Sequence, residues 1–224
     1  MIYALTGFVV GLLIPYMARR FAKSMPSAPT YALYNLIKPV KTTRKVKFST
    51  RYRQLKKRYL ARSIFCAVIT AALSMVAFYR FGEAGIGWYL GFVWVLLLLA
   101  EVDFKTLILP DILTIPLLIC GFMFAAFAGT PLSPQESALA ALAGYVLPVT
   151  ATLLMLWRSS EAFGFGDIKL LSAIGAWLGV ENVIYTILLS CAVFGIYAAL
   201  RRERAGAFGP ALAVSAIIIL LFFN

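Results

Sequence analysis

Long continuous apolar runs, separated by short polar segments, dominate this chain of 224 residues. Their apolar positions are consecutive, which is typical of membrane helices, whereas strands of a membrane barrel alternate. A helix needs about 20 mostly apolar residues to cross a bilayer. The runs predict helices near residues 2–18, 63–79, 86–102, 112–130, 138–157, 168–180, 183–200 and 207–223. We therefore expect an all-α, polytopic integral membrane protein, a bundle of about eight transmembrane helices.

The basic residues give this bundle an orientation. The net charge is +12, and hydrophobic residues make up 62% of the chain. Most lysines and arginines lie in the segment 19–62, which has no acidic residue. Cytoplasmic loops carry such an excess, so we place this segment in the cytoplasm and the N-terminus outside. The other basic residues then follow on the same side, Arg80 excepted. The charge is thus explained without a nucleic-acid partner.

The chain divides into two predicted parts. Residues 1–85 hold two spans joined by the basic cytoplasmic loop 19–62, and residues 86–224 hold six helices with short connections. Within the loop, residues 48–59 either form a helix on the anionic membrane surface or serve only as a topology signal. Membrane lipid is therefore an expected partner.

Histidine is absent from the sequence, and each of the three cysteines lies alone in an apolar run. Ser-His-Asp and Cys-His nucleophile systems are therefore excluded. A zinc site has almost no ligands to use. We expect no metal and no cofactor, and acid–base chemistry is left to carboxylates, lysine or tyrosine.

Four acidic residues, Glu101, Asp103, Asp111 and Asp167, lie at the edges of apolar runs, where charges are expensive and usually functional. Asp103 ends the run 86–102 and precedes an apolar linker. Asp167 follows two glycines that break the helix and allow a close approach of backbone. Both aspartates are expected at the cytoplasmic ends of their helices.

Two neighbouring carboxylates can share one proton, so that one activates water and the other protonates a scissile carbonyl. Asp103 is expected at a helix C-terminus, which favours its protonated form, and Asp167 at an N-cap, which favours its ionised form. Asp103 would then hold the proton and Asp167 would be the base. The alternatives are an interfacial charge at Asp103 and a simple helix cap at Asp167.

The neighbouring polar residues allow two interpretations each. Asp111 follows Pro110 at the start of a predicted span, where capping is favoured. Lys105 and Lys169 each lie two residues after an aspartate, either as interfacial anchors or as groups that tune a carboxylate. Glu101 is expected at the interface or in support of the aspartates.

At these residues the chain resembles the prepilin (type IV leader) peptidase family. The resemblance rests on the block 103–117, with Leu-Pro-Asp at 109–111, and on Gly-x-Gly-Asp at 164–167. It implies that Asp103 and Asp167 are the catalytic pair of an aspartic endopeptidase. It also implies removal of the basic leader from type IV prepilins or type II secretion pseudopilins, at the cytoplasmic face of the bacterial inner membrane. Six further residues are expected to support the site or position the substrate: Gly164, Gly166, Lys105, Lys169, Pro110 and Asp111.

The first loop departs from the family pattern. Many members carry two C-x-x-C pairs there and methylate the new N-terminus, but segment 19–62 has no cysteine. Zinc binding in this loop is therefore excluded, and we expect no N-methylation by this chain alone.

A transporter that uses the same aspartates as a proton or cation relay is the alternative function. It predicts carboxylates near the middle of the bilayer and an internal repeat. The sequence shows no repeat, and the aspartates lie toward one face.

Overall fold

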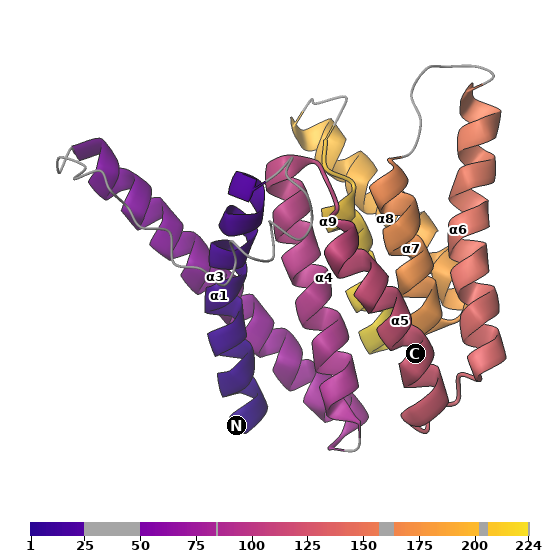
Figure 1. Ribbon diagram of the computed structural model, residues 1–224. Coiled ribbons are helices and arrows are strands. Elements are labelled where there is room, and N and C mark those ends of the chain that lie inside the picture. Colours follow the sequence, from indigo (N-terminus) through magenta and orange to yellow (C-terminus); the bar gives the residue numbers. More distant parts are fainter. Residues whose placement is uncertain (25–49, 84, 157–163, 202–205, 224) are drawn as a thin grey trace.

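The computed structural model describes residues 1–24, 50–83, 85–156, 164–201 and 206–223, and all of its regular structure there is helical (Figure 1). The helices are α1 (Ile2–Ser24), α3 (Thr50–Phe81), α4 (Ile86–Thr106), α5 (Asp111–Phe127), α6 (Pro134–Leu156), α7 (Phe165–Leu178), α8 (Val180–Arg201) and α9 (Gly209–Phe222). Each of the predicted apolar runs overlaps one of these helices.

The helices differ in whether they are long enough to cross a membrane. Five of them, α1, α3, α4, α6 and α8, have the length and apolar composition of membrane spans. Helices α5 and α9 are apolar but shorter, with 17 and 14 residues, and α7 has 14. The chain is thus a polytopic helical membrane protein, and at about 1.5 Å per residue the three short helices are 21 to 26 Å long, less than the hydrocarbon thickness.

Helix α3 is longer than the sequence predicts. It runs without a break from Thr50 to Phe81, so residues 50–59 of the predicted surface helix are continuous with the span that follows. Residues 48 and 49 of that prediction lie outside the described residues. Most of the basic loop, residues 25–49, lies outside the described residues.

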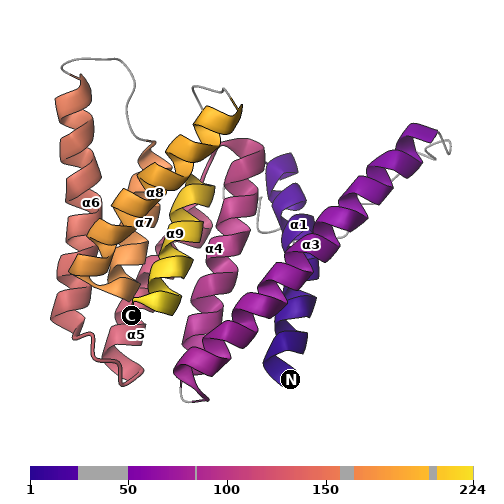
Figure 2. The same ribbon diagram turned by 180° about the vertical axis from the view of Figure 1, so that it is seen from behind.

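Helix α7 is the central helix of the C-terminal part, and its residues from Ile168 to Leu178 include ten that are buried. Its neighbours α5, α6 and α8 surround it in Figures 1 and 2. Polar side chains fix it to these neighbours. The Ser172 hydroxyl donates to the Ala141 carbonyl at 2.8 Å, and the Trp177 indole donates to the Leu117 carbonyl at 2.8 Å. Hydrogen bonds of this kind hold helices together where the hydrophobic effect between them is weak.

Helices α1 and α3 pack against the opposite side of α4, where α3 crosses obliquely (Figure 2). Ile14 and Phe21 of α1 form one buried cluster with Leu98 and Val102 of α4. Helix α4 therefore stands between the N-terminal helix pair and the C-terminal helices, with both of its sides covered.

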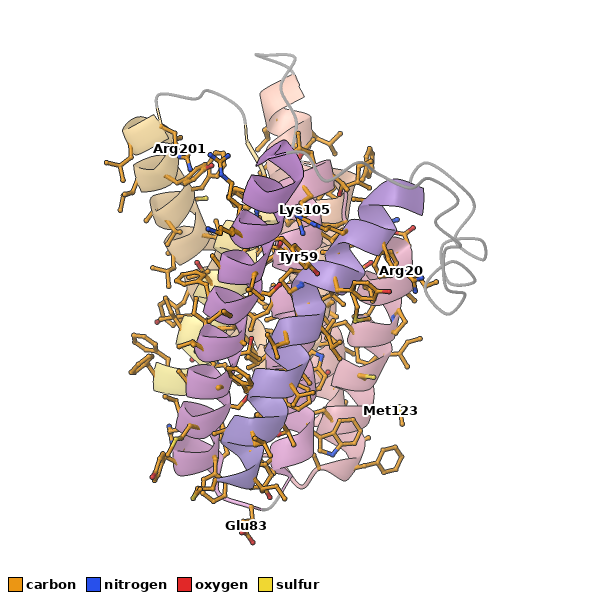
Figure 3. The ribbon with its side chains drawn as sticks, turned by 90° about the vertical axis from the view of Figure 1, so that its left-hand side faces the viewer. Arg20, Tyr59, Glu83, Lys105, Met123 and Arg201 are labelled. Atoms are coloured by element: carbon orange, nitrogen blue, oxygen red, sulfur yellow. The ribbon has the colours of Figure 1, made fainter. Side chains whose placement is uncertain are left out.

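The end of α4 and the starts of α5, α7 and α9 lie at the same end of the bundle, the upper end in Figure 1. Lys105 and Arg201 lie toward this end and Glu83 at the opposite end (Figure 3). Four helix termini thus converge where the sequence places the candidate aspartates.

Candidate active site

Asp103 lies in the last turn of α4 and is almost fully buried, with 4% of its surface exposed. The helix ends at Leu107, whose φ of 55° is in the left-handed region that side chains other than glycine rarely adopt. The chain then turns through a short link into α5.

The carboxylate of Asp103 is bound by the start of another helix. The backbone N–H of Gly209, the first residue of α9, donates to Asp103 Oδ2 at 2.9 Å. A Cβ atom at position 209 would lie 2.7 Å from the same oxygen, so only glycine fits there without a shift. Helix N-termini present free N–H groups to anions, and here that anion is the side chain of Asp103. Sequence reasoning missed Gly209, because no local motif links it to a residue 106 positions earlier.

Asp167 is the third residue of α7, after the N-cap Gly164. The expectation that Asp167 is itself the N-cap is therefore wrong, and no side-chain cap hydrogen bond is formed at this helix start. Gly166 approaches the link after α4 so closely that a Cβ on it would lie 2.9 Å from Leu109 Cβ. This is the close approach that the glycines predict. It brings Asp167 near enough to Asp103 for their charges to interact.

The failed cap removes part of the basis for the predicted proton assignment. That assignment relied on backbone N–H groups at Asp167 and on the helix C-terminus and apolar surroundings at Asp103. In the structure the backbone N–H donor is found at Asp103 instead, supplied by Gly209 of α9. A hydrogen bond of this kind stabilises an ionised carboxylate.

Glu101 is 9% exposed and forms ion pairs with two cations. Its Oε2 lies 2.8 Å from an Arg62 nitrogen of α3, and its Oε1 lies 2.6 Å from Lys105 Nζ. The Arg62 guanidinium also lies over the Phe104 ring, 5.1 Å from its centroid. Lys105 therefore pairs with Glu101, and Arg62, which the sequence did not single out, ties α3 to the end of α4.

Asp111 and Lys169 form the remaining pair. Lys169 Nζ lies 2.8 and 2.7 Å from the two carboxylate oxygens of Asp111, which joins the starts of α5 and α7. The N-cap of α5 is Pro110, without a side-chain hydrogen bond, so the predicted capping by Asp111 is wrong. The Lys169 side chain is 41% exposed and the Asp111 side chain 52%, so water screens this ion pair.

The structure thus sorts the four candidate carboxylates into two kinds. Glu101 and Asp111 are each neutralised by lysine or arginine. Within the described residues, no ion pair includes Asp103 or Asp167, although both are buried or half-buried and close to each other. Two such carboxylates cannot both be ionised at low cost, because desolvation and mutual repulsion disfavour the doubly charged state. This is the arrangement in which two acids share one proton.

The described residues contain no group of three or more His, Cys, Asp or Glu side chains that could hold a metal ion.

The fold and site together define a polytopic helical membrane protein with two adjacent carboxylates where α4, α7 and α9 meet. Residues 90–199 match the model of the type IV leader peptidase family. The chain belongs to that family over this matched region, which includes Asp103 and Asp167 and excludes α1 and α3.

Several curated bacterial proteins are similar to the chain, and those below share the name prepilin leader peptidase/N-methyltransferase. The protein of Dichelobacter nodosus is 36% identical over 168 residues, which cover 72% of this chain and 58% of that protein. The protein of Aeromonas salmonicida is 37% identical over 175 residues, with the same coverage. The protein of Klebsiella pneumoniae is 43% identical over 96 residues, 42% of each chain. The matches thus span little more than half the length of the longer relatives. No solved structure matches the chain.

Proposed function

We propose that this chain is a membrane-embedded aspartic endopeptidase that removes the basic leader from type IV prepilins or type II secretion pseudopilins. The observation that carries the proposal is the pair of Asp103 and Asp167, close together and without cationic partners among the described residues. The family match and the names of the relatives support the reaction and the substrate class. Gly209, Glu101 and Arg62 would position the site without taking part in the chemistry.

The proposed mechanism begins with a water molecule between the two carboxylates. The ionised carboxylate takes a proton from this water as the water oxygen attacks the scissile carbonyl carbon. The protonated carboxyl gives its proton to the carbonyl oxygen, which forms a neutral gem-diol. The first carboxyl then protonates the leaving amine as the C–N bond breaks, and the second carboxylate recovers a proton from the diol.

Asp103 is the better candidate for the ionised base, and Asp167 for the acid. The Gly209 N–H donates to Asp103 Oδ2 at 2.9 Å, whereas no hydrogen bond caps α7 at Asp167. This reverses the assignment expected from sequence. The two residues titrate as a pair, so the assignment describes the dominant arrangement of one shared proton.

Infrared difference spectra of Asp103→Asn and Asp167→Asn test this assignment. The protonated-carboxyl band of the resting enzyme should vanish in Asp167→Asn and survive in Asp103→Asn. The opposite result would show that Asp103 holds the shared proton. Because removing one partner perturbs the other, the intact pair should also be compared with and without a substrate analogue.

The location follows from the same proposal. The enzyme would lie in the bacterial inner membrane with its N-terminus outside, the basic segment 19–62 in the cytoplasm and the aspartates near the cytoplasmic face. The segment 19–62 lacks cysteine, so we propose leader removal without zinc and without N-methylation by this chain.

Co-expression with candidate prepilins tests the function through the gel shift that accompanies leader loss. Wild-type protein should process its prepilin, while Asp103→Asn and Asp167→Asn should each abolish processing, because neither carboxylate can replace the other. Immunoblots of the membrane fraction control for insertion. Processing at the wild-type rate by either variant would refute the assignment of catalytic residues. Mass spectrometry of the mature pilin separates plain cleavage from cleavage with methylation.

A further inference from the structure

An apolar groove lies between the end of α4 and helices α8 and α9, and its volume is about 450 Å³. Its lining residues are Phe104, Leu107, Val193, Phe194, Tyr197, Arg201, Gly206, Ala207, Pro210, Ala211 and Val214. We call this the α8–α9 groove. Its volume is in the range of ligand sites. Three other cavities among the described residues are smaller, with volumes of about 190, 380 and 200 Å³.

The groove begins directly beside the candidate active site. Phe104 follows Asp103 in the chain, and Pro210 follows Gly209, the residue whose N–H binds the Asp103 carboxylate. Phe104 and Pro210 also line a second, smaller cavity of about 190 Å³ on the α3 side. The wall of the groove therefore includes the chain neighbours of both Asp103 and Gly209.

The lining chemistry selects an apolar occupant. Apart from Arg201 and the hydroxyl of Tyr197, the groove is lined by apolar side chains and by glycine. Arg201 lies toward the end of the bundle opposite Glu83 (Figure 3). Several of these side chains are far from buried: Phe104 is 46% exposed, Leu107 68% and Val214 43%. Apolar helices bind such grooves through side chains spaced three or four residues apart.

We propose that the α8–α9 groove binds the apolar segment of the substrate that adjoins the scissile bond. The proposal rests on the peptidase function proposed above and adds the surface that recognises the substrate. The continuity of the groove wall with Asp103 and Gly209 favours a peptide over a lipid acyl chain, because a peptide cleaved at Asp103 has to pass this wall. Specificity would then come from the fit of apolar side chains, while the two aspartates carry out the hydrolysis.

Two positions on α8 provide a matched test. Val193 lines the groove, whereas Ile196, one turn further on, is 63% exposed and lines none of the cavities found. Val193→Trp should fill part of the groove and raise the KM for prepilin about tenfold or more, with kcat nearly unchanged, because an apolar anchor of the substrate is displaced. Ile196→Trp should leave both constants at their wild-type values.

Photo-crosslinking gives a readout that does not depend on activity. A photoreactive phenylalanine analogue is placed at 193 or at 196 in the Asp167→Asn background, and prepilin is added in membranes. Crosslinks to the apolar segment should form from position 193 and at least about tenfold less from position 196. Equal crosslinking from both positions, or crosslinks from 193 to lipid alone, would overturn the proposed groove while leaving the peptidase function intact.

Wild-type cleavage of the same prepilin is measured first and separates the two proposals. If wild-type protein cleaves no prepilin, both the proposed function and the proposed role of the groove are refuted. If it cleaves, and Val193→Trp and Ile196→Trp behave alike, only the groove is refuted.

Discussion

Replacing Gly209 by alanine tests the idea that the start of α9 holds Asp103 in its working position. The added Cβ would lie 2.7 Å from Asp103 Oδ2 and 3.0 Å from its Cγ. Because carbon and oxygen atoms do not approach this closely, the carboxylate or the start of α9 has to move by several tenths of an ångström. That movement stretches or breaks the hydrogen bond of 2.9 Å from the Gly209 N–H.

The size of the effect follows from this one hydrogen bond. A hydrogen bond to a charged group contributes roughly 1.5–3 kcal/mol. Each 1.36 kcal/mol changes a rate by about tenfold, so a full loss lowers kcat about ten- to hundredfold. A carboxylate displaced by about 1 Å costs a similar factor through misalignment with its water. We expect kcat to fall by this amount and KM to change little, because the α8–α9 groove is left unfilled.

The assay is a time course of prepilin cleavage by purified protein in detergent or nanodiscs. Gly195→Ala on α8 is the matched control, since a Cβ there would meet nothing within 4 Å. Thermal unfolding and membrane yield show whether each variant is folded. A folded Gly209→Ala protein with wild-type kcat would refute the argument that the Gly209 N–H positions Asp103.

Three further predictions concern the charges around the site. Glu101→Gln should lower the free energy of unfolding by about 1–3 kcal/mol, as measured in a thermal shift assay. This is less than the cost of breaking a fully buried ion pair, because the Arg62 side chain is 40% exposed. Asp111→Asn and Lys169→Gln should each change the free energy of unfolding by no more than about 0.5 kcal/mol, because this ion pair is exposed. Both variants should keep most of their cleavage activity, and complete loss of activity in a gel-shift assay would indicate that the mutated residue is catalytic. Cleavage should follow a bell-shaped pH profile, falling at high pH as the pair loses its shared proton and at low pH as the remaining carboxylate is protonated, and EDTA should not change its height.

The helical pattern of the chain could be predicted because apolar runs have a direct physical cause. Each predicted run overlaps a helix of the structure, and the ends agree within about four residues except at the end of α1, Ser24, and the start of α3, Thr50. The number of full crossings was harder to predict. From Ile168 to Leu178 the apolar residues of α7 are buried by protein, so the hydrophobicity of this stretch reports burial within the bundle and not contact with lipid. Hydropathy alone does not separate these two environments.

The site was partly predictable for a similar reason. The cost of a charge at an apolar boundary singled out Glu101, Asp103, Asp111 and Asp167 from the sequence alone. It did not say which of them have partners, because the partners come from other helices. Arg62 is 39 positions from Glu101. Gly209 has no side chain, so that it offers no chemical signal at all. The catalytic assignment itself stays a prediction until the variants are measured.

The distribution of cations gives a physical reason why Asp103 and Glu101, two residues apart on α4, should have different roles. Both are at most 9% exposed, but Glu101 is held between Arg62 and Lys105. Both oxygens of the Glu101 carboxylate are therefore occupied by ion pairs. Asp103 accepts a neutral N–H instead, which stabilises its charge without a full counter-ion. Under the proposed mechanism, this leaves Asp103 available to take a proton from water and later release it, as a general base does. Lys105 contributes to this division by pairing with Glu101: if it turned toward Asp103, the base would be trapped in an ion pair.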